Sequence, residues 1–275
     1  MSKLYVVGTP IGNLGDFSPR AVETLQSVDF IAAEDTRVTL KLLNRFGIKK
    51  SMVSYFEHNK RERGEMITSR ILGGESCALV TDAGMPAISD PGEDLVRLCH
   101  EKGIRVESVP GPCAFTTALA LSGFPSGRFT FEGFLSVNKP SRREHLQSLE
   151  NETRTMLFYE APHKLGATLR DMNKAFGNRE IAIVREITKL HEEVIRTTLD
   201  EAVEKYADGS VKGEIVLVIK GAEKAESGDE MTFEQAVECA KRSVEDGMSV
   251  SEAAKQAAKL SGFKKGDIYK SLIGE

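Results

Sequence analysis

The chain has 275 residues and a formal net charge of −4, which argues against nucleic-acid binding by its surface as a whole. Its composition, 40% apolar and 28% charged, is that of a soluble protein with two domains and a small extra segment, and no apolar run approaches the ~20 residues of a membrane span. Four cysteines without CxxC spacing, and the lack of a Cys/His cluster, exclude a zinc site and predict a cytoplasmic protein without a bound metal.

Residues 1–123 alternate short apolar strands with helices, which predicts an α/β domain with a doubly wound parallel sheet. Ser18 followed by Pro19 marks one helix start, and Gly47 is placed to end the next helix. The expected strands are 4–7, 29–34, 77–80 and 104–109, and the expected helices are 18–28, 36–47, 61–72, 93–103 and 112–123. We expect the last of these helices to complete the domain.

Residues 124–222 are predicted to form a second α/β domain. The Gly-, Phe- and Ser-rich stretch 124–136 is interpreted as a crossing between the domains. The expected helices are 141–152, 163–177 and 199–207, and the expected strands are 155–160, 180–187, 191–199 and 214–221. Because two of these strands follow each other directly, we expect a mixed sheet rather than a purely parallel one.

Residues 231–275 follow a polar linker at 222–230 and are predicted to form a small helical tail. The expected helices span 232–247, 249–263 and 264–274, and their Gly-containing turn resembles a helix-turn-helix unit. Because the tail carries seven basic and seven acidic side chains, its charge does not support nucleic-acid binding. A nucleic-acid role for the tail stays open.

Three strands of the first domain run into Gly- and Pro-bearing loops, at 8–15, 81–92 and 110–113. Open α/β sheets bind ligands at the carboxyl ends of their strands, so we expect the three loops to build one pocket. The first loop reads G-x-x-x-G-x-x-G instead of G-x-G-x-x-G, and its Pro10 lacks the N–H that a pyrophosphate cradle uses. This favours an adenosine-like ligand over a dinucleotide.

Ionisable side chains at strand ends are candidates for chemistry, each with a structural alternative. Asp82 either accepts a hydrogen bond from a ligand or caps the amides of its own loop. The segment 185–192 crowds five ionisable groups, although an exposed strand would also alternate polar residues. His163 and His191 are acid/base candidates, or make structural hydrogen bonds only.

Residues 37–63 carry eight basic side chains against two acidic ones. Such a segment can supply phosphate contacts even in an acidic protein. The alternative is that these charges only solvate helix faces and a loop.

Seven motifs together carry a family resemblance. They are VVGTPIGNL, IAAEDTR, VTDAGMPAISDPG, VPGPCAFTTAL, FYEAPHK, IVREITKLHEE and KGEIVLVIKG. In their order and spacing, from about Leu4 to Gly221, the chain resembles the 16S rRNA ribose 2′-O-methyltransferase I family of the tetrapyrrole methylase superfamily. The resemblance implies two α/β domains of tetrapyrrole-methylase type in a homodimer, with S-adenosylmethionine in the cleft between the domains and a helix-turn-helix-like appendage.

The resemblance also implies which residues contact the cofactor. They are Gly8, Pro10, Gly12, Asp82, Gly84, Ala87, Ile88, Cys113, Ala114, Glu160, Ala161 and Thr188. Two departures from the family pattern are visible. Cys113 stands where the family usually has Ser, and Thr81 stands where Ser usually precedes Asp-Ala-Gly.

The implied reaction methylates the 2′ oxygen of a decoding-centre cytidine in 16S rRNA, position 1402 in the usual rRNA numbering, on the small ribosomal subunit. The hydroxyl proton must leave, and the candidate general bases are Glu186, His191 and Asp82. Methyl transfer itself requires no metal. The expected RNA contacts are Lys49, Lys50, Lys60, Arg61, Arg63, Arg185 and Lys189.

Three alternatives stay open at this point. A methyltransferase acting on a tetrapyrrole would share the cofactor pocket, and fold alone does not decide between the substrates. A helix-turn-helix nucleic-acid-binding regulator would work through residues 231–275. An NAD-dependent oxidoreductase would bind NAD instead of S-adenosylmethionine.

Overall fold

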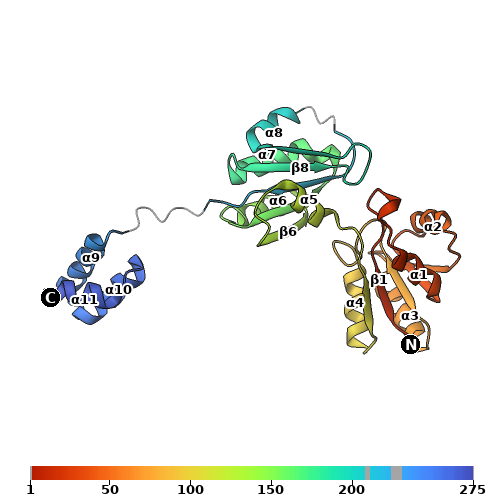
Figure 1. Cartoon of the computed structure of the whole chain (residues 1–275), viewed down its shortest axis with the longest axis horizontal. Helices are drawn as coiled ribbons and strands as arrows, with labels where there is room; N and C mark the ends of the chain where they lie inside the picture. The colour runs from red at the N-terminus through yellow and green to blue at the C-terminus, as the bar shows by residue number, and fades with distance from the viewer. Residues whose placement is uncertain (1, 208–210, 224–230, 275) are drawn as a thin grey trace. The chain divides into compact units, whose positions relative to one another are not determined.

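The computed structural model describes residues 2–207, 211–223 and 231–274. The chain divides into two compact units, Met1–Gly221 and Ala222–Glu275 (Figure 1). The first unit holds a five-stranded parallel sheet and a five-stranded mixed sheet, and the second holds three helices. The predicted fold class is therefore confirmed.

The parallel sheet has the strand order β3-β2-β4-β1-β5. Its strands are β1 (Leu4–Val7), β2 (Phe30–Ala33), β3 (Ser51–Ser54), β4 (Cys77–Val80) and β5 (Val106–Val109). The connecting helices are α1 (Pro19–Ser27), α2 (Thr36–Arg45), α3 (Lys60–Leu72) and α4 (Gly92–Glu101). The Ser18 hydroxyl accepts from the Ala21 N–H, as expected for the cap of α1.

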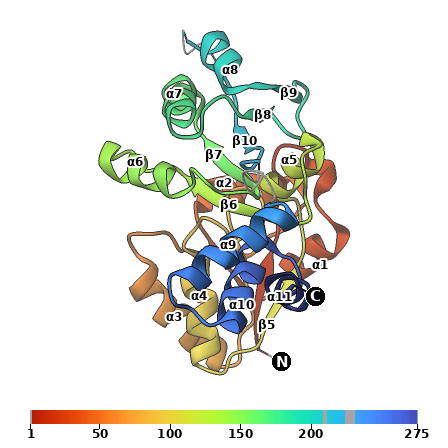
Figure 2. The ribbon, with the colours of Figure 1, turned by 90° about the vertical axis from the view of Figure 1, so that its left-hand side faces the viewer.

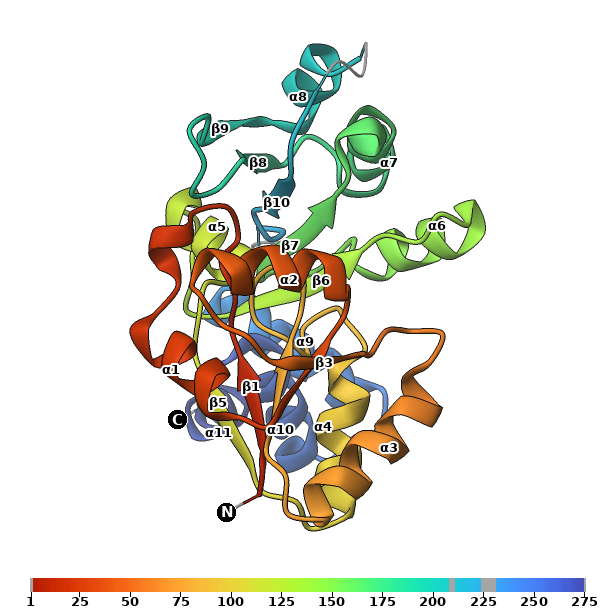
Figure 3. The same cartoon turned by 90° about the vertical axis from the view of Figure 1, so that its right-hand side faces the viewer.

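Alternating side chains along each strand bury both faces of this sheet, as a doubly wound fold requires. In β2, Ile31 and Ala33 pack with α1 and α2, whereas Phe30 and Ala32 pack with α3 and α4. Figure 3 looks onto the face that α1 and α2 cover.

Strand β3 is absent from the predicted strands. Its sequence, SMVS, is short and only half-buried, because β3 is an edge strand paired on one side with β2. It therefore lacks the continuous apolar run that identifies the central strands.

The second sheet has the order β6-β7-β10-β8-β9 and is mixed, as predicted. Its strands are β6 (Phe129–Phe134), β7 (Thr155–Glu160), β8 (Glu180–Arg185), β9 (Glu193–Thr198) and β10 (Ile215–Ile219). Strand β6 pairs parallel with β7, and the other neighbours are antiparallel. The interpretation of 124–136 as a crossing was thus wrong for its second half, where an edge strand with an irregularity between Phe131 and Gly133 escapes recognition.

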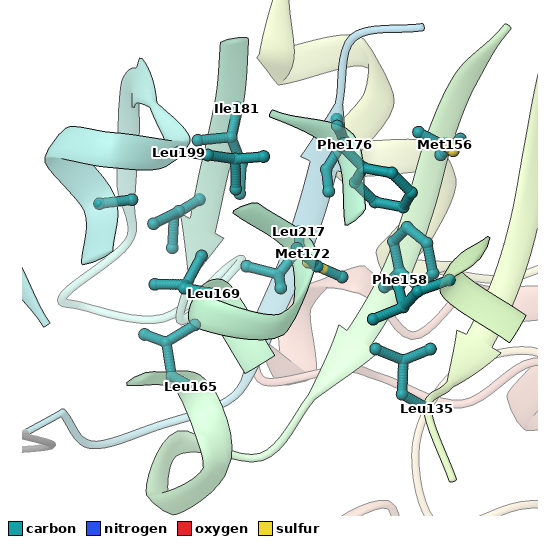
Figure 4. Close-up of a cluster of buried hydrophobic side chains, with 14 of the residues drawn as sticks. Leu135, Met156, Phe158, Leu165, Leu169, Met172, Phe176, Ile181, Leu199 and Leu217 are labelled. Atoms are coloured by element: carbon teal, nitrogen blue, oxygen red, sulfur yellow. The ribbon is translucent and has the colours of Figure 1, made fainter. Parts of the chain in front are cut away.

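The two faces of the second sheet are covered by different helices. Helices α6 (Lys139–Ser148), α7 (Leu165–Phe176) and α8 (Leu199–Lys205) close one core, in which Leu169, Met172 and Phe176 meet Phe158 and Leu217 (Figure 4). Helix α5 (Ala114–Ser122) covers the other face through Ala118 and Leu119 (Figure 2). The helix expected to complete the first domain therefore packs on the second sheet. The boundary between residues 123 and 124 stays a prediction.

The second unit contains α9 (Phe233–Glu245), α10 (Val250–Ser261) and α11 (Lys265–Ile273), which matches the three predicted helices. Their small core consists largely of alanines, with Ile268 contributed by α11. Most of the predicted linker, residues 224–230, lies outside the described residues. No helix in the described ranges is long and apolar enough to cross a membrane.

Candidate functional site

The loops that follow β1, β4 and β5 meet, as predicted. Thr9 and Gly84 exchange backbone hydrogen bonds of 2.9 and 3.2 Å, which joins the first loop to the second. A Cβ placed on Gly8 would lie 2.6 Å from the Cα of Gly111, so the first and third loops pack glycine against glycine. This contact requires both glycines.

A cavity of about 460 Å³ opens beside these loops, within the size range of small-molecule sites. The second and third loops line it from the parallel sheet, and Tyr159, Glu160 and Val216 line it from the mixed sheet. The complete lining is Ile11, Glu34, Thr81, Asp82, Ala83, Gly84, Met85, Ile88, Ser89, Asp90, Cys113, Ala114, Phe134, Tyr159, Glu160, Ala161, Pro162, Ile187, Gly213, Glu214, Ile215 and Val216.

The charged side chains of the cavity lining are all acidic. Glu34, Asp82, Asp90, Glu160 and Glu214 contribute carboxyl groups, and no Lys or Arg of the described ranges lines the cavity. Such a wall favours a cationic or hydroxyl-bearing ligand and disfavours phosphates. Glu34, which follows β2, is absent from the predicted site residues, although an acidic residue directly after a parallel strand was a usable signal.

Asp82 and Glu34 form a linked pair of carboxyl groups. The Thr81 hydroxyl donates to Glu34 Oε2 at 2.5 Å, and the Asp35 N–H donates to Asp82 Oδ1 at 3.1 Å. Asp82 thus caps one amide of a neighbouring loop and still lines the cavity. Burial, followed by the nearby Glu34 carboxylate, raises the pKa of Asp82 above its ordinary value.

The second loop contains a strained turn. Ala87 and Ser89 both adopt left-handed backbone conformations, with φ of 68° and 67°, which are uncommon outside glycine. The Asp90 carboxylate holds the turn by accepting from the N–H groups of Ala87, Ile88 and Gly92 at 2.8–3.3 Å. Strain of this kind concentrates at ligand-binding sites.

The mixed sheet contributes a fixed carboxylate and an aromatic wall. Glu160 is buried and accepts from the Thr168 hydroxyl and from the Ala161 N–H. Tyr159 contacts the rings of Phe131 and Phe134, with centroids 5.0 and 5.3 Å away. Burial raises the pKa of Tyr159 to about 12, so its hydroxyl stays protonated at neutral pH.

The loop after β8 contains a second strained pair, Glu186 and Thr188, with φ of 53° and 67°. Glu186 Oε1 accepts from Lys189 Nζ at 2.9 Å and from the Glu214 N–H at 3.0 Å, and these partners lower the pKa of Glu186. The Thr188 hydroxyl is buried and has no hydrogen-bond partner within the described part of the chain. A Cβ on Gly12 would lie 2.9 Å from this hydroxyl, so the first loop contacts the loop after β8 at Thr188.

The structure brings together most of the predicted cofactor residues. Those that line the cavity are Asp82, Gly84, Ile88, Cys113, Ala114, Glu160 and Ala161. Gly8, Pro10, Gly12, Ala87 and Thr188 lie in or against the surrounding loops and are not part of the lining. Of the candidate bases, Asp82 alone lines the cavity, and His191 is exposed on the loop after β8.

The predicted RNA contacts do not form one surface. Lys50 directly precedes β3, whose first residue pairs with the first residue of β2, so Lys49 and Lys50 lie at the amino ends of the strands. Lys60, Arg61 and Arg63 begin α3, after the carboxyl end of β3.

Three of these cations are also engaged within the chain. Lys60 pairs with Glu57 and Asp94 at 2.7 and 2.8 Å. Arg185 pairs with Glu193 at 2.9 Å, and Lys189 pairs with Glu186 at 2.9 Å. Their roles in RNA binding stay predictions.

Comparisons with solved structures agree with this architecture. The methyltransferase CobJ superposes with a TM-score of 0.62 and 17% identity, covering 81% of this chain and 95% of that one. Uroporphyrin-III C-methyltransferase from Thermus thermophilus, complexed with S-adenyl homocysteine, gives a TM-score of 0.53 and 17% identity over 79% of this chain and 97% of that one. At this identity the likeness establishes the fold alone.

Sequence comparisons find proteins with higher identity to this chain. The family described as Tetrapyrrole (Corrin/Porphyrin) Methylases matches residues 3–203. The ribosomal RNA small subunit methyltransferase I of Synechocystis sp. is 44% identical over 270 residues, 98% of this chain and 96% of that protein. The protein of the same name from Thermotoga maritima is 49% identical over 223 residues, which are 81% of this chain and 100% of that protein. The chain therefore belongs to the ribosomal RNA small subunit methyltransferase I family, within the tetrapyrrole methylases.

Proposed function

We propose that this methyltransferase transfers a methyl group from S-adenosylmethionine to the ribose 2′ oxygen of a cytidine in 16S rRNA, at position 1402. The observation that carries the proposal is the cavity wall, whose charged side chains are all carboxylates. A sulfonium nucleoside is cationic and rich in hydroxyl and amine donors, which complements such a wall. The family membership supports the same substrate.

The residues present fit the cofactor. Asp82 and Glu34 present carboxylate acceptors for ribose hydroxyl or amine donors, and Ala114, the first residue of α5, also lines the cavity. The Thr188 hydroxyl, which has no hydrogen-bond partner among the described residues, supplies a further polar group beside Gly12 of the first loop. When bound, S-adenosylmethionine supplies an activated methyl group.

The chain's contribution to the reaction is positioning and proton removal. A ribose hydroxyl is a poor nucleophile, so holding its oxygen in line and accepting its proton both raise the rate. Asp82 is the best placed acceptor, because it lines the cavity and its pKa is raised. Glu186 is less suited, because Lys189 and the Glu214 N–H lower its pKa.

The cavity also separates this proposal from its rivals. The pyrophosphate of NAD and the several carboxylates of a uroporphyrinogen would both meet the acidic wall, whereas a ribose carries no charge.

The regulator alternative depends on residues 231–275. The Thermotoga relative is matched over its whole length by 223 residues of this chain, so about the length of the second unit has no counterpart in it.

The test is a methylation assay on small ribosomal subunits from cells that lack this protein, with a porphyrinogen offered side by side. The expected result is one new 2′-O-methylcytidine at position 1402, found by mass spectrometry of digested rRNA. Methylation of the porphyrinogen instead, or of another nucleotide, would contradict the proposal. Deleting residues 222–275 should preserve methyl transfer and at most weaken subunit capture.

The proposal includes a homodimer in the cytoplasm, where small ribosomal subunits are assembled. The family resemblance supports the dimer, and light scattering tests it. The expected mass is about twice the 30.2 kDa of one chain. A mass of one chain at micromolar concentration would contradict the dimer.

A further inference from the structure

A second hollow, of about 590 Å³, lies between α6 and α7. We call it the α6–α7 groove. Its charged lining consists of five basic side chains, Lys139, Arg142, Arg143, Arg170 and Lys174, and two acidic ones, Glu150 and Asp171. The groove therefore has the opposite charge to the cofactor cavity.

Most of the positive charge in the groove is available to a ligand. Lys139, Arg143, Arg170 and Lys174 are exposed, and none of them has an ion-pair partner among the residues that the structure describes. Arg142 pairs with Asp171, and its Nε is buried without a hydrogen-bond partner in the described ranges. Arg170 and Lys174 are four residues apart on α7, so their charges lie on the same helix face, about 6 Å apart along the axis.

A short stretch of chain links the lining of the cavity to the lining of the α6–α7 groove. Phe134 lines the cavity, and Val137, three residues later, lines the groove. Both side chains are unusually exposed for their type, 61% for Phe134 and 77% for Val137. The ring of Phe134 also contacts Tyr159, which places an aromatic surface at the cavity mouth.

We propose that the α6–α7 groove binds the phosphodiester backbone of the ribosomal RNA while the target nucleotide enters the cavity past Phe134. This inference rests on the proposed function and names the surface that captures its substrate. Cationic grooves beside exposed aromatic rings are the way proteins hold single-stranded RNA, with phosphates on the cations and bases stacked on the rings. In the 37–63 segment, by contrast, the basic side chains divide between two ends of the sheet, and Lys60 is already paired.

The test measures binding of small ribosomal subunits by the full-length protein as salt is raised from about 50 to 200 mM. The variant is Arg143→Gln/Arg170→Gln/Lys174→Gln. The matched control is Arg20→Gln/Arg128→Gln/Lys205→Gln, which removes three exposed cations that do not line the groove. Each variant is first checked for an unchanged melting temperature and an unchanged Kd for S-adenosylmethionine.

The expected result is subunit binding at least tenfold weaker for the groove variant at 200 mM salt, with a slope of log K against log salt smaller by about 2, since each lost phosphate contact removes roughly 0.7. The control should bind like the wild type. If subunit binding were weakened equally in both variants, or in neither, the proposal that the groove binds rRNA would be overturned. If the groove variant lost binding to the subunit but still bound the naked rRNA fragment fully, the groove would contact a ribosomal protein. That result would also overturn the proposal that the groove binds rRNA. Failure of the wild-type protein to methylate subunits would instead refute the proposed function.

Discussion

Two hollows of the first unit are similar in size, and their linings carry opposite charge. The cavity between the loops after β1, β4 and β5 and the end of β7 presents five carboxyl groups, whereas the α6–α7 groove presents five cations. The difference shows how one protein can bind a small cation and a large polyanion together. In the proposed function, the cations would hold the phosphates outside, and an uncharged ribose and base would enter among the carboxylates.

The largest effect is expected from neutralising the cavity at Asp82. Asp82→Asn should lower kcat for subunit methylation by about 10²–10⁴-fold, the range for loss of a general base. Because the pKa of Asp82 is raised, wild-type activity should fall as pH drops through a value above the ordinary pKa of an aspartate. That fall should disappear in the variant.

The matched variant is Glu186→Gln. In the wild type, the Glu186 carboxylate accepts a hydrogen bond from Lys189, and Glu186 is not part of the cavity lining. It should retain the wild-type pH profile. An Asp82→Asn enzyme with normal kcat and a raised Kd for S-adenosylmethionine would make Asp82 a cofactor contact only.

A smaller effect is expected at Phe134, the exposed aromatic side chain of the cavity lining. Phe134→Ala should lower kcat/KM for subunits by roughly 5- to 150-fold, because stacking on one base is worth about 1–3 kcal/mol. Calorimetry should give a nearly unchanged Kd for S-adenosylmethionine. Weakened cofactor binding with normal subunit affinity would place Phe134 on the cofactor side instead.

Thr188→Val tests whether the buried Thr188 hydroxyl forms a hydrogen bond with the cofactor. Removing an unpartnered hydroxyl should stabilise the free protein by about 1 kcal/mol, which is a rise in Tm of roughly 2–4 °C. The same change should weaken S-adenosylmethionine binding by about 2- to 10-fold through the lost hydrogen bond.

Thr130→Val is the control, since Thr130 also has a buried hydroxyl without a partner in the described part of the chain but lies in β6, not in the loop after β8 that contacts Gly12. It should stabilise the fold and leave the Kd unchanged. Equal cofactor affinities for the two variants would exclude Thr188 from the site.

The smallest effect concerns Cys113, which occupies the N-cap of α5 and makes no side-chain cap hydrogen bond. Cys113→Ser should add about 0.5–1 kcal/mol of stability, because Ser is a strong N-cap residue. Differential scanning calorimetry should show a Tm higher by a degree or two, with activity retained. A lower Tm would mean that the thiol packs better than a capping hydroxyl.

Much of this architecture was predictable because apolar strands end abruptly in Gly- and Pro-bearing loops. The runs CALV and LYVV are central strands buried on both faces, so their boundaries are visible in the sequence. The edge strands β3 and β6 are half-buried, and their weaker patterns resemble loops. Helix α5 was predicted in place, but its partner sheet depends on long-range packing that no local pattern encodes.

The site was predictable in the same unequal way. Asp82 lies two residues after the end of β4, Cys113 lies four residues after the end of β5, and both line the cavity. The left-handed turns at Ala87 and Thr188 could not be predicted from the sequence, because neither position is a glycine. The α6–α7 groove combines cations from two helices about 30 residues apart, whereas the basic segment 37–63 is continuous in sequence and divided in space.

The separation of the two ligands is tested most directly by a structure of the protein on the small ribosomal subunit with S-adenosylhomocysteine bound. We expect the nucleoside between Asp82 and Glu160, and the rRNA backbone along Arg143, Arg170 and Lys174. Cofactor density outside the carboxylate cavity, or rRNA phosphates that avoid α6 and α7, would contradict this account.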